Sequence, residues 1–150
     1  HYRWSSSFSY KLYRAPVAVD AGKTEPIEVK KISKGSKTKS GTKKHTWSID
    51  IPVLARSLVK AGDKLIIIGP RKLYEEKKAI QKLEDPSTAG KIKAQAESWD
   101  KTADLLVISA ADGKMEQRVS FDFAPVWDGV AIAEEALFLS ATEGTVYRLQ

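Results

Sequence analysis

The strongest constraint on the fold of this chain is an internal repeat with an offset of 72 residues. The segments that align are residues 48–51 with 120–123, 58–59 with 130–131, and 65–67 with 137–139. In each block, the alternation of apolar residues and the placing of turn residues read as strand, linker, strand, turn and strand. A single sheet of this size cannot bury both of its faces. The repeat therefore predicts successive sheets that cover one another. The alternative is a chance similarity between two meanders of one β-sandwich.

The offset is longer than the repeats of roughly 40–50 residues that are usual for β-propeller blades. An insertion between the two blocks accounts for the difference. Residues 72–100 are poor in β-branched side chains and rich in Glu, Lys, Ala and Gln. Leu73, Ile80 and Leu83 share one face at helical spacing, and Asp85 before a proline is a typical start of a second helix. We therefore predict a helical hairpin over residues 72–100.

The rest of the sequence is typical of antiparallel strands joined by tight turns. Residues 46–51 and 115–123 have strand-like patterns, and Asp112 followed by Gly113 is a dipeptide favoured in hairpin turns. We expect an all-β fold of about two antiparallel propeller-type blades, a partial β-propeller with an inserted helical hairpin. Residues 104–149 are expected to form the last blade. The longest apolar run, residues 65–68, is too short for a membrane span, which needs about 20 residues.

The positive charge of the chain is concentrated in one segment. The formal net charge is +6, and residues 23–44 alone contain eight lysines and two glutamates. Residues 30–44 are also rich in Ser, Thr and Gly, which predicts a flexible, solvated loop. Its candidate contacts to a polyanion are Lys30, Lys31, Lys34, Lys37, Lys39, Lys43 and Lys44. The segment lacks interleaved aromatic residues, so nucleic acid is not the favoured partner.

Few residues of the chain are suited to catalysis or metal binding. There is no cysteine, and His1 and His45 lie in no catalytic or metal-binding motif. We therefore predict no catalytic residue, no metal site and no cofactor. Trp127 and Asp128 are the candidates for ligand binding, because an indole can stack on a flat ligand beside a carboxylate. The alternative is that Trp127 is a core or sheet-interface aromatic and that Asp128 belongs to a turn or bulge.

Several segments resemble a known family. Residues 131–149 (AIAEEALFLSATEGTVYRL) resemble the closing unit of pyrroloquinoline-quinone-like β-propeller repeats. Residues 125–131 (PVWDGVA) and 58–70 (LVKAGDKLIIIGP) are similar to segments of large secreted propeller proteins of planctomycete-type bacteria. The tryptophan that the family carries four residues after the turn glycine is replaced here by Gln117. The resemblance implies the C-terminal portion of a longer quinoprotein-like propeller, located in the periplasm or outside the cell.

This resemblance and the missing catalytic motifs together favour a non-catalytic function. We expect a portion of a larger secreted or periplasmic protein that binds or scaffolds a protein or ligand. The expected partners are the remaining blades of the parent propeller or companion chains, and a protein ligand. One alternative is a part of a quinone- or metal-dependent oxidoreductase, although the family's calcium, base aspartate and stacking tryptophan have no assigned counterparts here. The other alternative is a basic polyanion-binding module.

Overall fold

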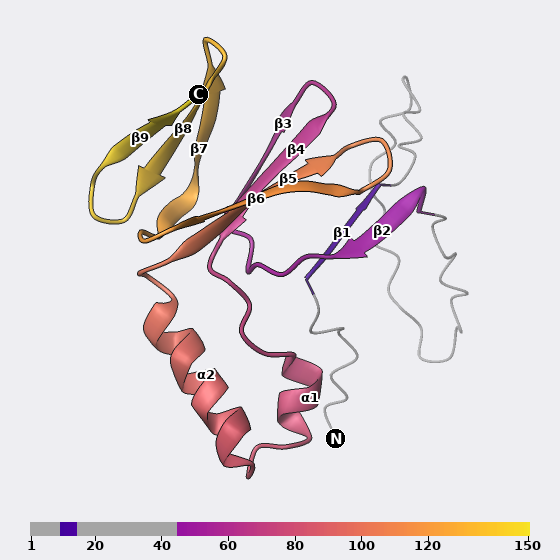
Figure 1. Ribbon diagram of the computed structural model, residues 1–150, viewed down its shortest axis with the longest axis vertical. Helices are drawn as coiled ribbons and strands as arrows, with labels where there is room; N and C mark the ends of the chain where they lie inside the picture. The colour runs from indigo at the N-terminus through magenta and orange to yellow at the C-terminus, as the bar shows by residue number, and fades with distance from the viewer. Residues whose placement is uncertain (1–9, 15–44) are drawn as a thin grey trace, which may run out of the picture.

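The computed structural model describes residues 10–14 and 45–150, which form antiparallel sheets and two helices (Figure 1). The strands are β1 (Lys11–Arg14), β2 (Trp47–Asp50), β3 (Ser57–Ala61), β4 (Lys64–Gly69), β5 (Ala103–Ser109), β6 (Met115–Phe121), β7 (Pro125–Ala133), β8 (Ala136–Ala141) and β9 (Val146–Leu149). The helices are α1 (Glu76–Ile80) and α2 (Pro86–Ser98). The expectation of a mostly β, antiparallel fold is confirmed for this part of the chain. The predicted basic loop, residues 30–44, lies outside the described residues.

The strands pair in chain order within three sheets. β1 pairs with β2, β3 to β6 form a four-stranded sheet, and β7 to β9 form a three-stranded sheet. We call the β3–β6 sheet the central sheet. The sequence analysis assigned residues 104–149 to one blade, and the pairing corrects that boundary. β5 and β6 belong to the central sheet because the apolar run of β5 pairs along β4, whereas β7 begins a separate sheet.

The two middle strands of the central sheet, β4 and β5, are buried on both faces, and this explains their continuous apolar sequences. Successive side chains of a strand point to opposite faces of the sheet. Ile67 of β4 and its cross-strand partner Leu106 of β5 lie in one apolar cluster. The next pair along the strands, Ile68 and Leu105, lies in a second cluster. Two buried faces thus require apolar residues at consecutive positions, where a half-exposed strand would alternate.

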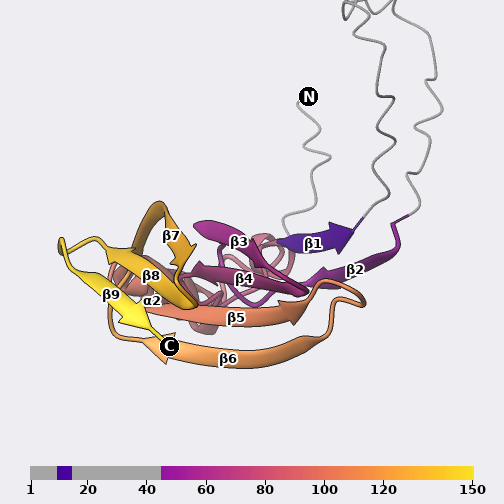
Figure 2. The same ribbon diagram turned by 90° about the horizontal axis from the view of Figure 1, so that it is seen from above.

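The neighbouring sheets cover these two faces. Leu12 of β1 and Ile49 of β2 pack against the first cluster. Leu139 of β8 is part of the second cluster, and Tyr147 of β9 packs against it. Figure 2 shows the β1–β2 sheet and the β7–β9 sheet on opposite sides of the central sheet. The described chain is therefore a series of three sheets, each in contact with the next.

The repeat seen in the sequence relates equivalent strands of successive sheets. Shifted by 72 residues, β4 coincides with β8 from end to end, and β3 falls on the second half of β7. The same shift places β2 on the end of β6. Each repeat therefore contains the final strand of one sheet followed by the first two strands of the next.

The helical hairpin lies between β4 and β5 and extends from one end of the central sheet (Figure 1). Both helices fall within residues 72–100. Asp85 is the N-cap of α2, and its side chain accepts a hydrogen bond from the Thr88 backbone N–H. The prediction that Leu73, Ile80 and Leu83 share one face of the first helix is wrong. Helix α1 spans only residues 76–80, and the side chains of Ile80 and Leu83 are exposed.

Candidate functional site

A buried arginine joins the central sheet to the β7–β9 sheet and to the helical hairpin. Arg56 immediately precedes β3, and its side chain is only 3% exposed. Its guanidinium donates hydrogen bonds to the carbonyl oxygen of Pro125 at 2.9 Å and to that of Trp99 at 3.0 Å. It also pairs with Asp100 Oδ1 at 2.7 Å. We call this group, together with Trp127, the Arg56 junction. One side chain thereby fixes three elements that are far apart in sequence.

Two indole rings lie against the same guanidinium. The central carbon of Arg56 is 5.2 Å from the ring centroid of Trp99 and 5.9 Å from that of Trp127. Both distances are within the range of cation–π attraction, which is about 6 Å. Trp127 is 65% exposed, so it is not a core aromatic, but its contact with Arg56 places it at the junction of two sheets, as the interface form of the alternative interpretation supposed. It covers the Arg56 junction while presenting most of its surface to solvent.

An irregularity of β7 places Trp127 in this position. The pairing of β7 with β8 is interrupted between Pro125 and Val130. Within the interruption, Asp128 has a φ of 53°, in the left-handed region that non-glycine residues rarely adopt. A Cβ at Gly129 would lie 2.3 Å from a methyl carbon of Val126 and 3.1 Å from the carbonyl oxygen of Ser140, so a larger residue would force its neighbours to shift. Bulges of this kind turn a side chain away from its regular direction, here the indole of Trp127.

The second predicted ligand residue, Asp128, is also exposed. Its backbone N–H donates to the carbonyl oxygen of Arg56 at 3.2 Å, which connects the bulge to the Arg56 junction. Trp127 and Asp128 are thus both exposed at the bulge, next to a buried cation. The seven lysines predicted to contact a polyanion lie outside the described residues.

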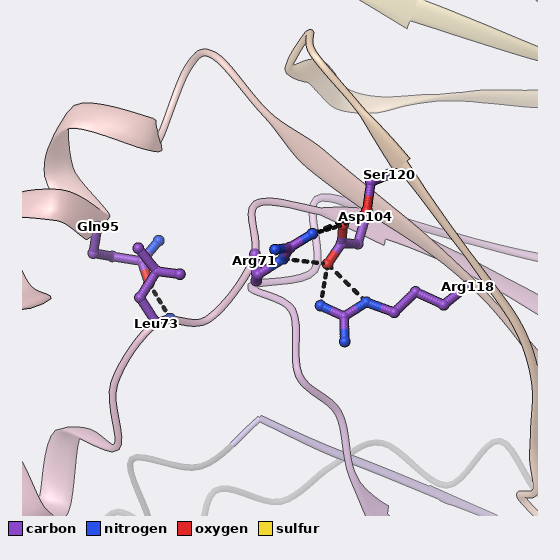
Figure 3. A network of polar contacts seen from close by, with 6 residues as sticks. All are labelled: Arg71, Leu73, Gln95, Asp104, Arg118 and Ser120. Atoms are coloured by element: carbon purple, nitrogen blue, oxygen red, sulfur yellow. Dashed lines mark hydrogen bonds and ion pairs between the residues drawn. The ribbon is translucent and has the colours of Figure 1, made fainter.

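A second polar cluster, the Asp104 network, lies in the central sheet (Figure 3). Asp104 of β5 is 1% exposed. It accepts hydrogen bonds from Arg71 Nε and Nη2, both at 2.9 Å, and from Ser120 Oγ at 2.7 Å. Arg118 donates to Asp104 Oδ2 through both Nε and Nη2. Register explains the cluster, because Asp104 pairs with Ser120 across the sheet and Arg118 is two residues earlier on the same face of β6.

The network keeps Asp104 ionised. Burial alone raises the pKa of the Asp104 carboxyl group, but the hydrogen bonds from Arg71, Ser120 and Arg118 outweigh it and hold the pKa far below its ordinary value of 3.8. A general base needs a pKa nearer the operating pH and a free acceptor site facing its substrate. Both Asp104 oxygens already accept from side chains of the protein. The carboxylate is therefore suited to holding β5, β6 and the segment that follows β4 together.

The sequence analysis missed Arg56, Arg71, Asp104 and Arg118. One signal was present for Asp104, since a carboxylate at the start of the apolar strand of residues 103–109 requires a partner if the strand is buried. The partners themselves have no local signal. Arg71 is 33 residues from Asp104, and Pro125 is 69 residues from Arg56.

Comparison with protein-family models, with curated proteins and with solved structures found no match to this chain. Within residues 10–14 and 45–150, no group of three or more His, Cys, Asp or Glu side chains is placed to hold a metal ion. None of the helices in the described part of the chain is long and apolar enough to cross a membrane.

Proposed function

We propose that the chain is a non-catalytic portion of a propeller-type series of sheets in a larger secreted or periplasmic protein, and that it serves to bind or scaffold a protein or ligand. The observation that carries this proposal is the central sheet, which neighbouring sheets cover on both faces. Blades of a propeller are covered in the same way, and equivalent strands of successive blades return at a fixed offset. The resemblance of residues 131–149 to pyrroloquinoline-quinone-like repeats supports the same architecture.

The outer sheets offer surfaces for the proposed partners. In the described part of the chain the β1–β2 sheet has two strands and the β7–β9 sheet has three, against four in the central sheet. Tyr13 of β1 and Val146 of β9 are each more than half exposed, as is Leu58 of β3, an edge strand of the central sheet. A pocket of about 530 Å³, with Leu12 and Trp47 in its wall, opens beside Leu58. Further sheets from the parent protein or a companion chain would bury this apolar surface, which stabilises association.

Trp127 and Asp128 are the proposed contacts to a smaller ligand. The exposed indole offers a flat apolar surface, and the guanidinium beneath it fixes its position. A pre-ordered aromatic side chain loses little conformational freedom on binding. The Arg56 junction and the Asp104 network supply rigid support, since their hydrogen bonds join different strands and the hairpin.

Hydrogen exchange tests the proposed association of sheets. Amide exchange would be measured for the 150-residue chain alone and within the longer polypeptide that the proposal requires. We expect the amides of β4 and β5 to exchange slowest in both samples, because they are central and buried. Amides of β1, β2 and β9 should gain protection only in the longer polypeptide. Equal protection of these outer strands in both samples would overturn the proposal.

A separate assay tests the absence of catalysis. The chain would be incubated with pyrroloquinoline quinone and Ca²⁺, then with primary alcohols and a redox dye, beside a known quinone-dependent dehydrogenase as positive control. We expect no dye reduction and no shift of the melting temperature. Turnover above the protein-free rate would replace our proposal by the alternative of a quinone-dependent oxidoreductase.

A further inference from the structure

A pocket of about 540 Å³ lies between the two helices of the hairpin (Figure 1), and we call it the hairpin pocket. All residues of its wall lie between Lys72 and Lys91, in α1, in the first half of α2 and in the segments beside α1. Its volume is within the range of ligand sites in proteins. One continuous part of the described chain thus forms the whole pocket.

Positive charge predominates in the wall of the hairpin pocket. Its charged residues are two carboxylates, Glu75 and Asp85, and four lysines, Lys72, Lys78, Lys82 and Lys91. The carboxylate of Asp85 is already engaged, because it accepts from the backbone N–H of Thr88 at the start of α2. Among the described residues, Lys78, Lys82 and Lys91 belong to no ion pair. A cavity lined mainly by one sign of charge concentrates ions of the opposite sign, here anions.

Lys72 is a second indication of an anionic ligand. Its side chain is only 9% exposed, although lysine is rarely buried without a close partner. The backbone fixes its place, because the Lys72 N–H donates to the carbonyl oxygen of Pro52 at 2.9 Å. Its ion pair among the described residues is with Glu75 Oε2 at 3.6 Å, which is longer than a hydrogen bond. An ammonium group has three donors, so this distant contact leaves Lys72 able to pair with an anion in the pocket that it lines.

We propose that the hairpin pocket binds an acidic peptide segment of a partner protein. The four lysines come from separate places, one before α1, one in it, one after it and one in α2. Charges spread around a cavity in this way complement a ligand with several carboxylates better than a single ion. Lysine is a point charge on a flexible stem, so it does not demand the planar partner that suits arginine. The inference rests on the proposed binding role of the chain but not on the association of sheets.

Titration of the 150-residue chain with short peptides tests the proposal. The probes are the peptide acetyl-Gly-Glu-Glu-Gly-Glu-Glu-Gly-amide, the same peptide with Gln in place of every Glu, and inorganic phosphate. Binding would be followed by calorimetry and by the NMR signals of the backbone amides. We expect saturable binding of the Glu peptide that shifts the signals of residues 72–91 and weakens as salt is added, because salt screens exposed charges. The Gln peptide and phosphate should bind about tenfold more weakly or less.

A pair of neighbouring lysines supplies the matched variants. Lys78→Gln should weaken binding of the Glu peptide by about threefold, since one exposed ion pair contributes modestly. Lys77→Gln is the control, because Lys77 is also exposed and in α1 but does not line the pocket, and it should bind as the wild type does. Both variants should keep the melting temperature of the wild type, because both side chains are exposed.

Three results would each overturn the proposal. They are equal affinity for the Glu peptide and either the Gln peptide or phosphate, equal affinities of the two variants, and signal shifts confined to residues 23–44. The last result would instead support polyanion binding by the lysine-rich segment. The exchange rates of β1, β2 and β9 do not depend on this pocket, so its failure can be distinguished from failure of the proposed function.

Discussion

Replacing Asp104 by asparagine removes the negative charge at the centre of the Asp104 network while keeping the size of the side chain. The carboxylate accepts five hydrogen bonds, four of them from the guanidinium groups of Arg71 and Arg118. In the variant, one oxygen can still accept from these donors, but the new amide N–H₂ group faces a guanidinium. We therefore expect a clear loss in the free energy of unfolding.

The magnitude follows from burial and exposure. Removing one partner of a buried ion pair costs about 3–5 kcal/mol when the remaining charge stays buried. Here the side chains of Arg71 and Arg118 are 47% and 39% exposed, so water can solvate them after the change. We therefore expect a smaller cost than this range, about 2–3 kcal/mol. For a domain of this size this corresponds to a fall in melting temperature of roughly 5–10 °C.

Urea denaturation of the wild type, Asp104→Asn and Asp122→Asn measures this effect. Asp122 is the matched control, because it is exposed and none of the ion pairs among the described residues includes it. The control should change the free energy of unfolding by less than about 0.5 kcal/mol. If Asp104→Asn costs no more than Asp122→Asn, the network does not stabilise the central sheet and the reasoning is refuted.

The same network gives a pH dependence with a defined sign. The pKa of Asp104 is lower in the folded protein than its ordinary value of 3.8, so the unfolded chain takes up the proton first as the pH falls. The stabilisation is therefore complete above about pH 5 and is lost progressively below pH 4. The free energy of unfolding, measured by urea denaturation between pH 2 and pH 6, should depend less steeply on pH in Asp104→Asn than in the wild type. Parallel curves would contradict this assignment.

Three further predictions concern individual positions. Gly69→Ala should lower the free energy of unfolding by about 1–3 kcal/mol, because the new Cβ would lie 2.1 Å from the backbone carbonyl oxygen of Leu54. Gly90→Ala should raise it by about 0.5–1 kcal/mol, because Gly90 lies in α2 with open space around it. Equal effects of the two variants in urea denaturation would disprove the steric argument. The turn between β7 and β8 is formed by Glu134 and Glu135, whose φ values are 49° and 60°. Replacing them by Asn-Gly should stabilise the folded protein by about 1–2 kcal/mol, because these residues favour such turns. An unchanged melting temperature would count against strain at this turn. Trp127→Ala should cost less than about 1 kcal/mol in urea denaturation because the indole is mostly exposed, and a loss above 2 kcal/mol would assign it to the core instead.

The sequence predicted those features that depend on local patterns. Alternating strands, the repeat of 72 residues and the helical hairpin all follow from spacings of a few residues or from direct self-comparison. The start of α2 at Asp85 is a local signal too, because a capping side chain bonds within its own first turn. The exposed Ile80 and Leu83 show the limit of such patterns, since an apolar spacing does not reveal whether a partner surface exists.

The candidate site depended on the tertiary structure. Trp127 and Asp128 could be selected from the sequence, but the exposure of the indole results from a bulge and from the buried Arg56 beneath it. Asp104 acquires its arginines only when β4, β5 and β6 pair in one register, and a shift of one residue would turn Arg118 to the other face.

The sequence by itself thus determined the kinds of element in this protein and their order along the chain. The tertiary structure decided the division of residues 104–149 between two sheets, the burial of β4 and β5 on both faces, and the partners of the buried Arg56 and Asp104. The physical reason is the range of the interactions involved. Turn, cap and strand preferences act over a few residues, whereas burial and charge pairing depend on which distant segments come into contact.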